Sequence, residues 1–200
     1  MSAIKRRTIL LVEDDAITAM MERKRLEREG YAILHAVSGE KAVELVVEGQ
    51  APVDLILMDI DLGRGIDGTV AAQRILARAE IPILFLSSHT EQEVVDKTER
   101  ISSYGYVVKS SSFTVLDASI KMAFKLFESR KLYQRTFDNS ISGLCIHRML
   151  YGDDGEPRDC EYLKVNAAFE RHTGLSAASL IGRTIRDVFP EGQADEVIAL

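Results

Sequence analysis

Short, nearly continuous apolar runs alternate with longer amphipathic stretches through the first 128 residues of the chain. The runs are Thr8–Val12, Tyr31–Ala36, Val53–Met58, Ile81–Leu86 and Tyr104–Val108. Such runs are typical of strands that are covered on both faces, as in a parallel sheet. The stretches beside them predict helices at about residues 16–29, 39–48, 68–79, 91–102 and 113–135. This alternation predicts an α/β fold with a doubly wound, five-stranded parallel sheet and right-handed crossovers.

The last predicted helix is longer than the sheet requires. At 1.5 Å per residue it would extend over roughly 35 Å. The apolar stripe that would pack on the sheet consists of Phe113, Leu116, Ile120, Ala123 and Phe127. Residues 128–131 are polar, so we expect the helix to leave the domain as a connector. A helix of this kind is also a candidate contact between two copies of the chain.

The pattern changes after about Phe137. Ile141–Leu150 and Cys160–Val165 predict two strands, and the seven residues 151–157 between them are rich in turn formers. Asn166 is then expected to cap a short helix that reaches Thr173-Gly174, and a second short helix is expected from Ser176 to Gly182.

Composition narrows the class of protein without naming its function. The chain has 200 residues, of which 46% are hydrophobic and 28% charged, as in ordinary globular proteins. Its net charge of −6 argues against direct nucleic-acid binding. We find no apolar stretch long enough for a signal peptide or a membrane span, and Cys145 and Cys160 lack metal-ligand spacing. We therefore expect a cytoplasmic protein that has no membrane partner.

Polar side chains stand where four of the predicted strands end. Glu13-Asp14, Asp59, Ser87 and Lys109 each follow one apolar run, and the carboxyl ends of parallel strands are where α/β sheets bind ligands. Three carboxylates brought together suit Mg²⁺ or Mn²⁺, with the backbone carbonyl of Asp61 as a further oxygen ligand. Asp59 would be a nucleophile toward phosphorus, Ser87 a hydrogen-bond donor and Lys109 a cation for the phosphoryl oxygens.

These pieces carry a family resemblance. Residues 5–128 resemble the receiver domain of two-component response regulators, whose flavodoxin-like sheet has the strand order 2-1-3-4-5. The matching pieces are Ile9-Leu10-Leu11-Val12-Glu13-Asp14-Asp15, Asp54-Leu55-Ile56-Leu57-Met58-Asp59, Leu86-Ser87-Ser88 and Gly105-Tyr106-Val107-Val108-Lys109. The resemblance implies that Asp59 accepts a phosphoryl group from a histidine kinase or a histidine phosphotransfer protein. It also implies that Glu13 and Asp14 hold Mg²⁺ and that Tyr106 is an aromatic switch.

Two departures from the receiver pattern concern the surroundings of the site. Ser110 follows Lys109 where the family has a proline, and a cis bond before a non-proline residue costs about 3–4 kcal/mol. We therefore predict a trans peptide and an altered loop. Residues 61–68 form a loop that is one residue longer and richer in glycine than is typical. His89 could influence dephosphorylation, although a solvated loop histidine is the simpler interpretation.

Residues 138–200 resemble the first part of a PAS domain. The pieces that match are Val165-Asn166-Ala167-Ala168-Phe169, His172-Thr173-Gly174-Leu175 and Leu180-Ile181-Gly182-Arg183-Thr184. A complete PAS domain has three further strands, so we expect the chain to come from a longer protein. No flavin or haem motif is recognisable. The predicted organisation is a receiver domain at 1–128, a helical linker at 129–137 and a partial α+β PAS segment at 138–200.

The leading hypothesis is phosphorelay signalling, in which the chain itself catalyses only its own phosphorylation and dephosphorylation. It remains open whether the full-length parent is a histidine kinase. One alternative is a metal-dependent aspartyl phosphatase or phosphotransferase, because Asp61 stands two residues after Asp59, as the acid/base of that class does. The other is a protein-interaction module that is not phosphorylated.

Overall fold

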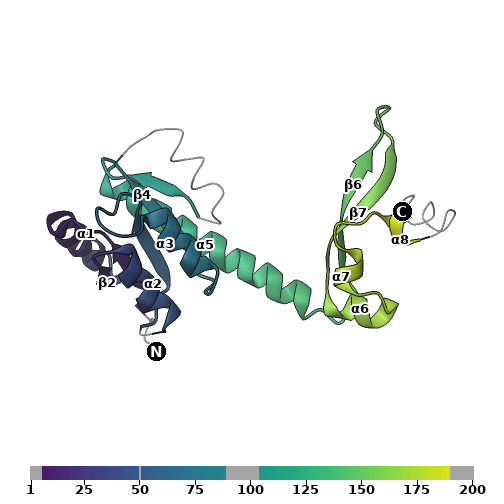
Figure 1. Cartoon of the computed structure of the whole chain (residues 1–200), viewed down its shortest axis with the longest axis horizontal. Coiled ribbons are helices and arrows are strands. Elements are labelled where there is room, and N and C mark those ends of the chain that lie inside the picture. Colours follow the sequence, from purple (N-terminus) through teal and green to yellow (C-terminus); the bar gives the residue numbers. More distant parts are fainter. Residues whose placement is uncertain (1–5, 50, 89–103, 190–200) are drawn as a thin grey trace. The chain divides into compact units, whose positions relative to one another are not determined.

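The computed structural model describes residues 6–49, 51–88 and 104–189. The chain folds into two compact units that divide between Ser129 and Arg130. Figure 1 shows the elements of both. No helix in the described ranges is long and apolar enough to cross a membrane.

The first unit is built on a five-stranded sheet in the order β2-β1-β3-β4-β5, in which every pairing is parallel. The strands are β1 (Thr8–Val12), β2 (Ala32–Ala36), β3 (Leu55–Asp59), β4 (Ile83–Ser87) and β5 (Tyr106–Val108). The described helices are α1 (Ala16–Arg28), α2 (Gly39–Val47), α3 (Gly68–Leu76) and α5 (Phe113–Asp138). The predicted fold class and strand order are confirmed. The predicted helix at 91–102 lies outside the described residues.

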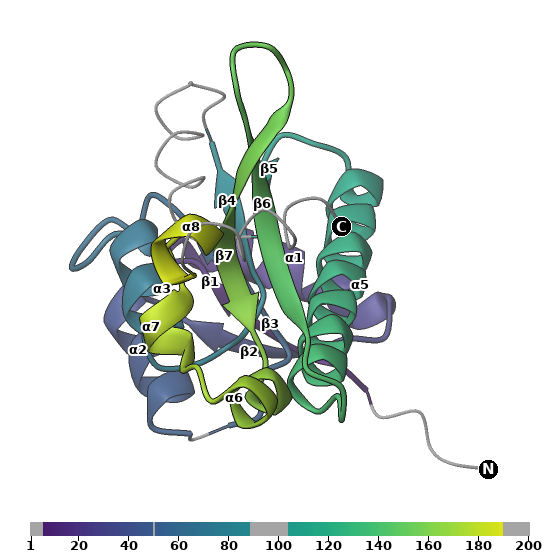
Figure 2. The ribbon, with the colours of Figure 1, turned by 90° about the vertical axis from the view of Figure 1, so that its right-hand side faces the viewer.

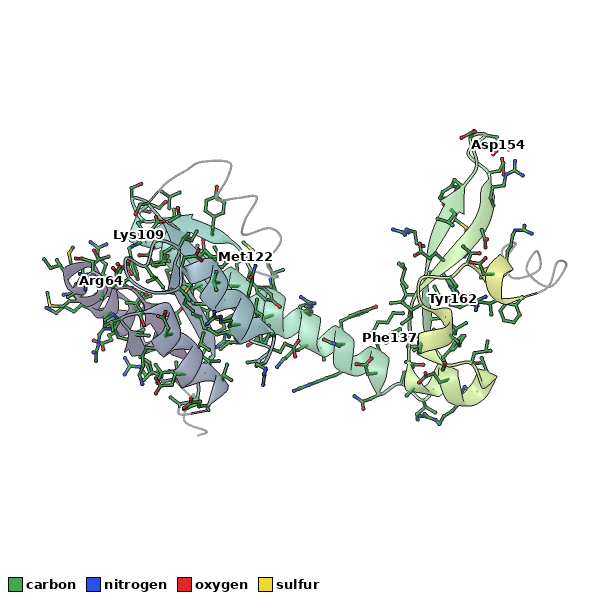
Figure 3. All side chains as sticks on the ribbon, in the orientation of Figure 1. Arg64, Lys109, Met122, Phe137, Asp154 and Tyr162 are labelled. Atoms are coloured by element: carbon green, nitrogen blue, oxygen red, sulfur yellow. The ribbon has the colours of Figure 1, made fainter. Side chains whose placement is uncertain are left out.

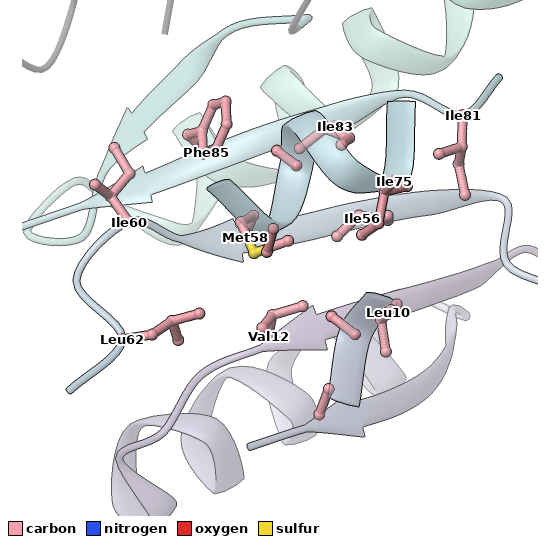
Figure 4. Packing of buried hydrophobic residues seen from close by; sticks show 14 residues of the cluster. Leu10, Val12, Ile56, Met58, Ile60, Leu62, Ile75, Ile81, Ile83 and Phe85 are labelled. Carbon is pink, nitrogen blue, oxygen red and sulfur yellow. The ribbon is translucent and has the colours of Figure 1, made fainter. Parts of the chain in front are cut away.

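Both faces of this sheet are covered, as the apolar runs predicted. Leu10, Ile56 and Ile83 point toward α2 and α3 in one core cluster, and Ile75 of α3 packs against them (Figure 4). The alternate residues of the same strands pack against α1 and α5 in a second cluster, which contains Ile9, Leu11, Leu57, Leu84, Leu26, Leu116, Ile120 and Phe124. All five residues of β3 are buried, which explains why its sequence does not alternate between apolar and polar.

The short side chains that cap the helices fix where each begins. Ser38 caps α2 by accepting a hydrogen bond from the Lys41 N–H, as predicted. Asp15 and Asp67 cap α1 and α3 in the same way. Gly30 has φ of +94°, the left-handed conformation that follows many helix ends. The cap residues therefore start α1 and α3 directly after the loops that carry Glu13-Asp14 and Asp61.

Helix α5 begins at Phe113 as predicted and continues to Asp138, three residues beyond the predicted end at 135. Phe124 is buried against the sheet, whereas the predicted stripe had placed Phe127 there. Phe127 instead meets the Tyr104 ring edge-on at 5.7 Å.

The second unit contains an antiparallel hairpin and three short helices (Figure 2). Its elements are β6 (Cys145–Tyr151), β7 (Pro157–Val165), α6 (Ala167–Thr173), α7 (Ala177–Leu180) and α8 (Ile185–Val188). The hairpin confirms the predicted pair of strands, but β6 begins four residues later than predicted and β7 three residues earlier. Asn166 caps α6 and the helix ends at Thr173-Gly174, both as predicted, with Gly174 in the left-handed conformation.

One buried side chain ties together the start of this unit. The Oδ1 atom of Asn166 accepts hydrogen bonds from the N–H groups of Leu144 and Phe169. Its Nδ2 atom donates to the carbonyls of Phe137 and Ser142. The residues before β6 therefore run through a turn held by Asn166 and cannot extend the strand, which explains the late start of β6.

Candidate functional site

Three carboxylates meet at the carboxyl ends of β1 and β3. One oxygen from each of Glu13, Asp14 and Asp59 lies within 4.8 Å of the others. Strands β1 and β3 pair in register up to Val12 and Met58, so the residues that follow come side by side. Glu13 is only 1% exposed and Asp59 2%, whereas Asp14 is exposed. The sequence prediction that these residues would be neighbours agrees with this geometry.

Burial changes the protonation of the two inner carboxyls. It raises the pKa of Glu13 above its ordinary value, although the hydrogen bond from Lys109 opposes this. Burial likewise raises the pKa of Asp59, again against Lys109. Removing a carboxylate from water disfavours its charged form, so a nearby positive charge is needed to keep it ionised.

Lys109 provides that charge. It follows β5 (Figure 3), and its backbone N–H bonds the carbonyl of Ser87 at 2.8 Å. Its Nζ atom donates to Glu13 Oε2 at 2.6 Å and to Asp59 Oδ2 at 2.7 Å. Burial alone would lower the pKa of Lys109, but the hydrogen bonds to Asp59 and Glu13 outweigh it and raise the pKa. Lys109 is therefore held as an ammonium group between two carboxylates.

The loop after β3 supplies backbone donors to the same carboxylates. Asp59 Oδ1 accepts the N–H of Asp61 at 3.2 Å, and Asp14 Oδ2 accepts the N–H of Gly63 at 3.1 Å. Glu40 of α2 anchors the far side of the loop through the Ile66 N–H at 2.8 Å. A hydrogen bond to the charged form favours ionisation, so the Asp61 N–H opposes the rise in the pKa of Asp59 that burial causes.

Two glycines allow this loop to approach so closely. A Cβ atom on Gly68 would lie 1.9 Å from the backbone oxygen of Asp59, which leaves no room for any side chain. Gly65 has φ of +99° and packs against the Glu40 carboxylate. The glycine-rich composition that marks this loop as atypical is thus explained by contacts with Asp59 and Glu40.

The remaining predicted residues lie at the ends of β4 and β5. Ser87 is fully buried as the last residue of β4, and Val108 pairs with it in register. Tyr106 begins β5 and is 39% exposed. The described residues contain no cis peptide bond, so the trans peptide predicted before Ser110 is confirmed. His89 lies outside the described residues.

One residue close to this site was not found from the sequence. The side chain of Glu22 in α1 has a buried Oε2 atom without a hydrogen-bond partner among the described residues. Its pKa is raised to about 7, first by burial and then by the charge of Glu13. The sequence does contain a pattern that places Glu22 on the inner side of the helix. Ala19, Glu22 and Leu26 share helical spacing, and the outer two are buried.

The donor set fits a hard divalent cation. Carboxylate oxygens and a backbone carbonyl are the ligands that Mg²⁺ and Mn²⁺ prefer. Three carboxylates facing the single ammonium of Lys109 leave an excess of negative charge in the cluster. A bound cation would offset this excess.

Comparisons with known proteins agree with this geometry. Residues 9–121 match the family model of the response regulator receiver domain, and residues 158–200 match a PAS fold model. The transcriptional regulatory protein PdtaR of Mycobacterium tuberculosis is 34% identical over 127 residues, which cover 63% of this chain and 60% of that protein. The match thus spans less than two thirds of that curated relative.

Solved structures show the same fold for the first unit. The N-terminal domain of a response regulator/sensory box/GGDEF 3-domain protein from Carboxydothermus hydrogenoformans is 42% identical, with a TM-score of 0.58, and the match covers 62% of this chain and 99% of that one. The response regulator TrrA of Thermotoga maritima, solved in complex with Mg(2+)-BeF, is 27% identical with a TM-score of 0.52. The match covers 58% of this chain and 98% of that one.

Proposed function

The chain belongs to the response regulator receiver domain family, and from this premise we propose that its first unit accepts a phosphoryl group on Asp59. The arrangement of the Asp59 carboxylate is the observation that carries the proposal. One of its oxygens accepts a hydrogen bond from the Asp61 N–H, and the other accepts one from the Lys109 ammonium. Glu13 and Asp14 lie beside the Asp59 carboxylate. A carboxylate held in this way is restrained in one orientation at the edge of the sheet.

The transfer would run from a phosphohistidine donor to Asp59. A carboxylate oxygen of Asp59 attacks phosphorus, the P–N bond breaks, and the imidazole leaves with the bonding electron pair and takes up a proton. The product is an acyl phosphate on Asp59. The Lys109 ammonium would stay beside the phosphoryl oxygens and balance their charge, and the Ser87 hydroxyl would donate a hydrogen bond to one of them.

Glu13, Asp14, Asp59 and the backbone carbonyl of Asp61 would hold Mg²⁺ or Mn²⁺. The ion, when bound, supplies positive charge next to the phosphoryl oxygens. Asp14 is the exposed member of this set, and the Gly63 N–H keeps its carboxylate directed toward the cluster. Tyr106 would act as the switch, turning inward as Ser87 engages the phosphoryl group. Its partly exposed position at the start of β5 leaves room for that movement.

The donor would be a histidine kinase or a histidine phosphotransfer protein in the cytoplasm. The output would pass along α5 from a receiver domain at 1–128, through a linker at 129–137, to the PAS-like segment at 138–200. The division of the chain between Ser129 and Arg130 supports the first of these limits.

We also propose that α5 contributes to a homodimer. Val115, Met122, Leu126 and Tyr133 are exposed along one side of the helix (Met122 is labelled in Figure 3), with spacings of seven, four and seven residues. Spacings of this kind are typical of helices that pair with another helix. Sedimentation velocity of the wild-type chain and of Met122→Lys would test this contact.

Incubation with acetyl phosphate and Mg²⁺, followed by intact-mass spectrometry, tests the phosphorylation of Asp59. The wild-type protein should gain one phosphoryl group, and Asp59→Asn should gain none. Asp61→Asn is the matched control, because it keeps the backbone carbonyl and N–H of residue 61 and should still be phosphorylated. Labelling of Asp59→Asn to the wild-type extent would overturn the proposal. Turnover of a generic phosphate ester that Asp61→Asn abolishes would favour the phosphatase alternative.

A further inference from the structure

Glu22 is a carboxyl group that packing does not require. It lies on the inner side of α1, in the same stripe as the buried residues Ala19 and Leu26. Its Oε2 atom is shielded from solvent and has no hydrogen-bond partner among the residues that the structure describes. A buried polar group without a partner destabilises the fold, whereas a leucine or methionine would fill the same space without this penalty.

Glu22 and Lys109 line the same small, partly open pocket. The pocket has a volume of about 30 Å³, and its walls include Glu22, Arg25, Leu86, Val107, Lys109 and Leu116. This volume is enough for one water molecule. Lys109 therefore takes part in both places: its Nζ atom donates to Glu13 and Asp59, and its side chain forms part of the pocket wall that Glu22 also lines.

The charged groups around Glu22 come from four elements. Glu13 and Asp59, at the ends of β1 and β3, disfavour its ionisation, and Lys109 after β5 and Arg25 of α1 favour it. The two α5 residues in the pocket wall, Phe113 and Leu116, are apolar. Any ligand that neutralises the Glu13–Asp59 cluster would leave Lys109 and Arg25 as the dominant charges near Glu22.

We propose that Glu22 is a positioning residue for Lys109. On the pocket side, the Glu22 carboxylate offers the Lys109 ammonium a second acceptor, which competes with Asp59 and Glu13. The inference rests on the proposed phosphorylation of Asp59. Ionised Glu22 draws Lys109 away from the position where it balances the charge of the incoming phosphoryl group, and so slows the transfer. Protonated Glu22 does not compete. Without a bound cation, the Glu22 pKa of about 7 leaves both states populated near neutral pH.

The rate of phosphorylation by acetyl phosphate at saturating Mg²⁺ tests this proposal in the intact chain. Wild type and Glu22→Gln are compared at about pH 5 and about pH 8, because a cation bound to the cluster offsets the charges of Glu13 and Asp59 and so lowers the Glu22 pKa. We expect equal rates at the lower pH and a rate roughly threefold to tenfold higher for Glu22→Gln at the higher pH, because the variant stays neutral. Glu22→Leu, which removes the same charge and makes the side chain apolar, should behave like Glu22→Gln and replaces it if that variant does not fold.

Glu29→Gln is the matched control. It makes the same change of charge at the exposed end of α1 and should follow the wild-type rate at both pH values. A ratio of variant to wild-type rate that does not change with pH would overturn the role of Glu22, even if both proteins are phosphorylated on Asp59. Failure of the wild-type protein to be phosphorylated at all would instead overturn the proposed function.

Discussion

At the scale of single residues, the half-buried side chain of Glu22 links the stability of the first unit to pH. Its pKa is about 7 in the folded protein, above its ordinary value of 4.5, so the folded state binds the proton more tightly. This contribution to stability is fully present below the unfolded pKa and is lost as pH rises to the folded pKa. A shift of this size corresponds to at most about 3 kcal/mol.

Glu22→Gln should remove that part of the pH dependence. Between about pH 5 and about pH 8, the free energy of unfolding of the first unit should fall in the wild-type protein. This fall should exceed the fall in the variant by up to about 3 kcal/mol. Denaturant unfolding in EDTA measures this, because chelation excludes any contribution from metal binding. Glu13 and Asp59 titrate in both proteins and cancel in the difference. Parallel pH profiles for the two proteins would show that Glu22 is ionised throughout.

Two glycines in the loop after β3 should respond differently to the same substitution. A Cβ at residue 68 would meet the backbone of Asp59 at 1.9 Å, whereas one at residue 63 would meet only the Asp14 carboxylate, at 2.9 Å. Backbone cannot move aside as a side chain can. Gly68→Ala should therefore destabilise the first unit by about 3 kcal/mol or more.

Gly63→Ala should leave stability nearly unchanged and weaken Mg²⁺ binding roughly tenfold, since it displaces a metal-binding carboxylate from its N–H donor. Thermal unfolding and calorimetric Mg²⁺ titration of both variants separate the two effects. If Gly63→Ala bound Mg²⁺ as tightly as wild type, the hydrogen bond from Gly63 would be irrelevant to the site.

At the scale of elements, Asn166 joins the last turn of α5 to β6 and α6. Its four hydrogen bonds reach Phe137, Ser142, Leu144 and Phe169, and the residue is 2% exposed. Asn166→Ala would leave buried backbone groups without partners, so we expect a loss of about 2–4 kcal/mol in the second unit. Asn139→Ala is the control, because that exposed side chain makes one hydrogen bond to the Arg135 carbonyl. Equal unfolding midpoints for the two variants would contradict this role.

The elements predicted well are those in which local pattern and tertiary environment agree. The strands ending at Val12, Met58 and Leu86 were recognisable because a parallel sheet buries both faces, and polar residues then mark its edge. The predicted start of β6 was wrong because Asn166, which lies more than twenty residues later in the chain, holds residues 142–144 in a turn. Glu22 was missed because its proposed role depends on Lys109, and only the folded chain brings Lys109 close to Glu22.

At the scale of the whole molecule, α5 is the one element that both compact units contain. It begins at Phe113 in the first unit and ends at Asp138 in the second, where Lys164 lies 4.4 Å above the Phe137 ring and 3.3 Å from the Asp138 carboxylate. The two core clusters of the sheet belong to the first unit, and the core around Tyr162 and Leu180 belongs to the second. Separate cores of this kind are expected to unfold separately.

Calorimetry should therefore resolve two thermal transitions, of which Mg²⁺ raises only the one that belongs to the first unit. At about one hundred times the dissociation constant, a ligand that binds only the folded state contributes about 2.7 kcal/mol. For a unit of this size that corresponds to an increase of roughly 8 °C in Tm. The transition of the second unit serves as an internal control, since the described residues that could hold a metal all lie in the first. Asp14→Asn should reduce the increase, because it removes one of the three carboxylates. A single transition that moves as a whole with Mg²⁺ would mean that α5 couples the two units into one cooperative body.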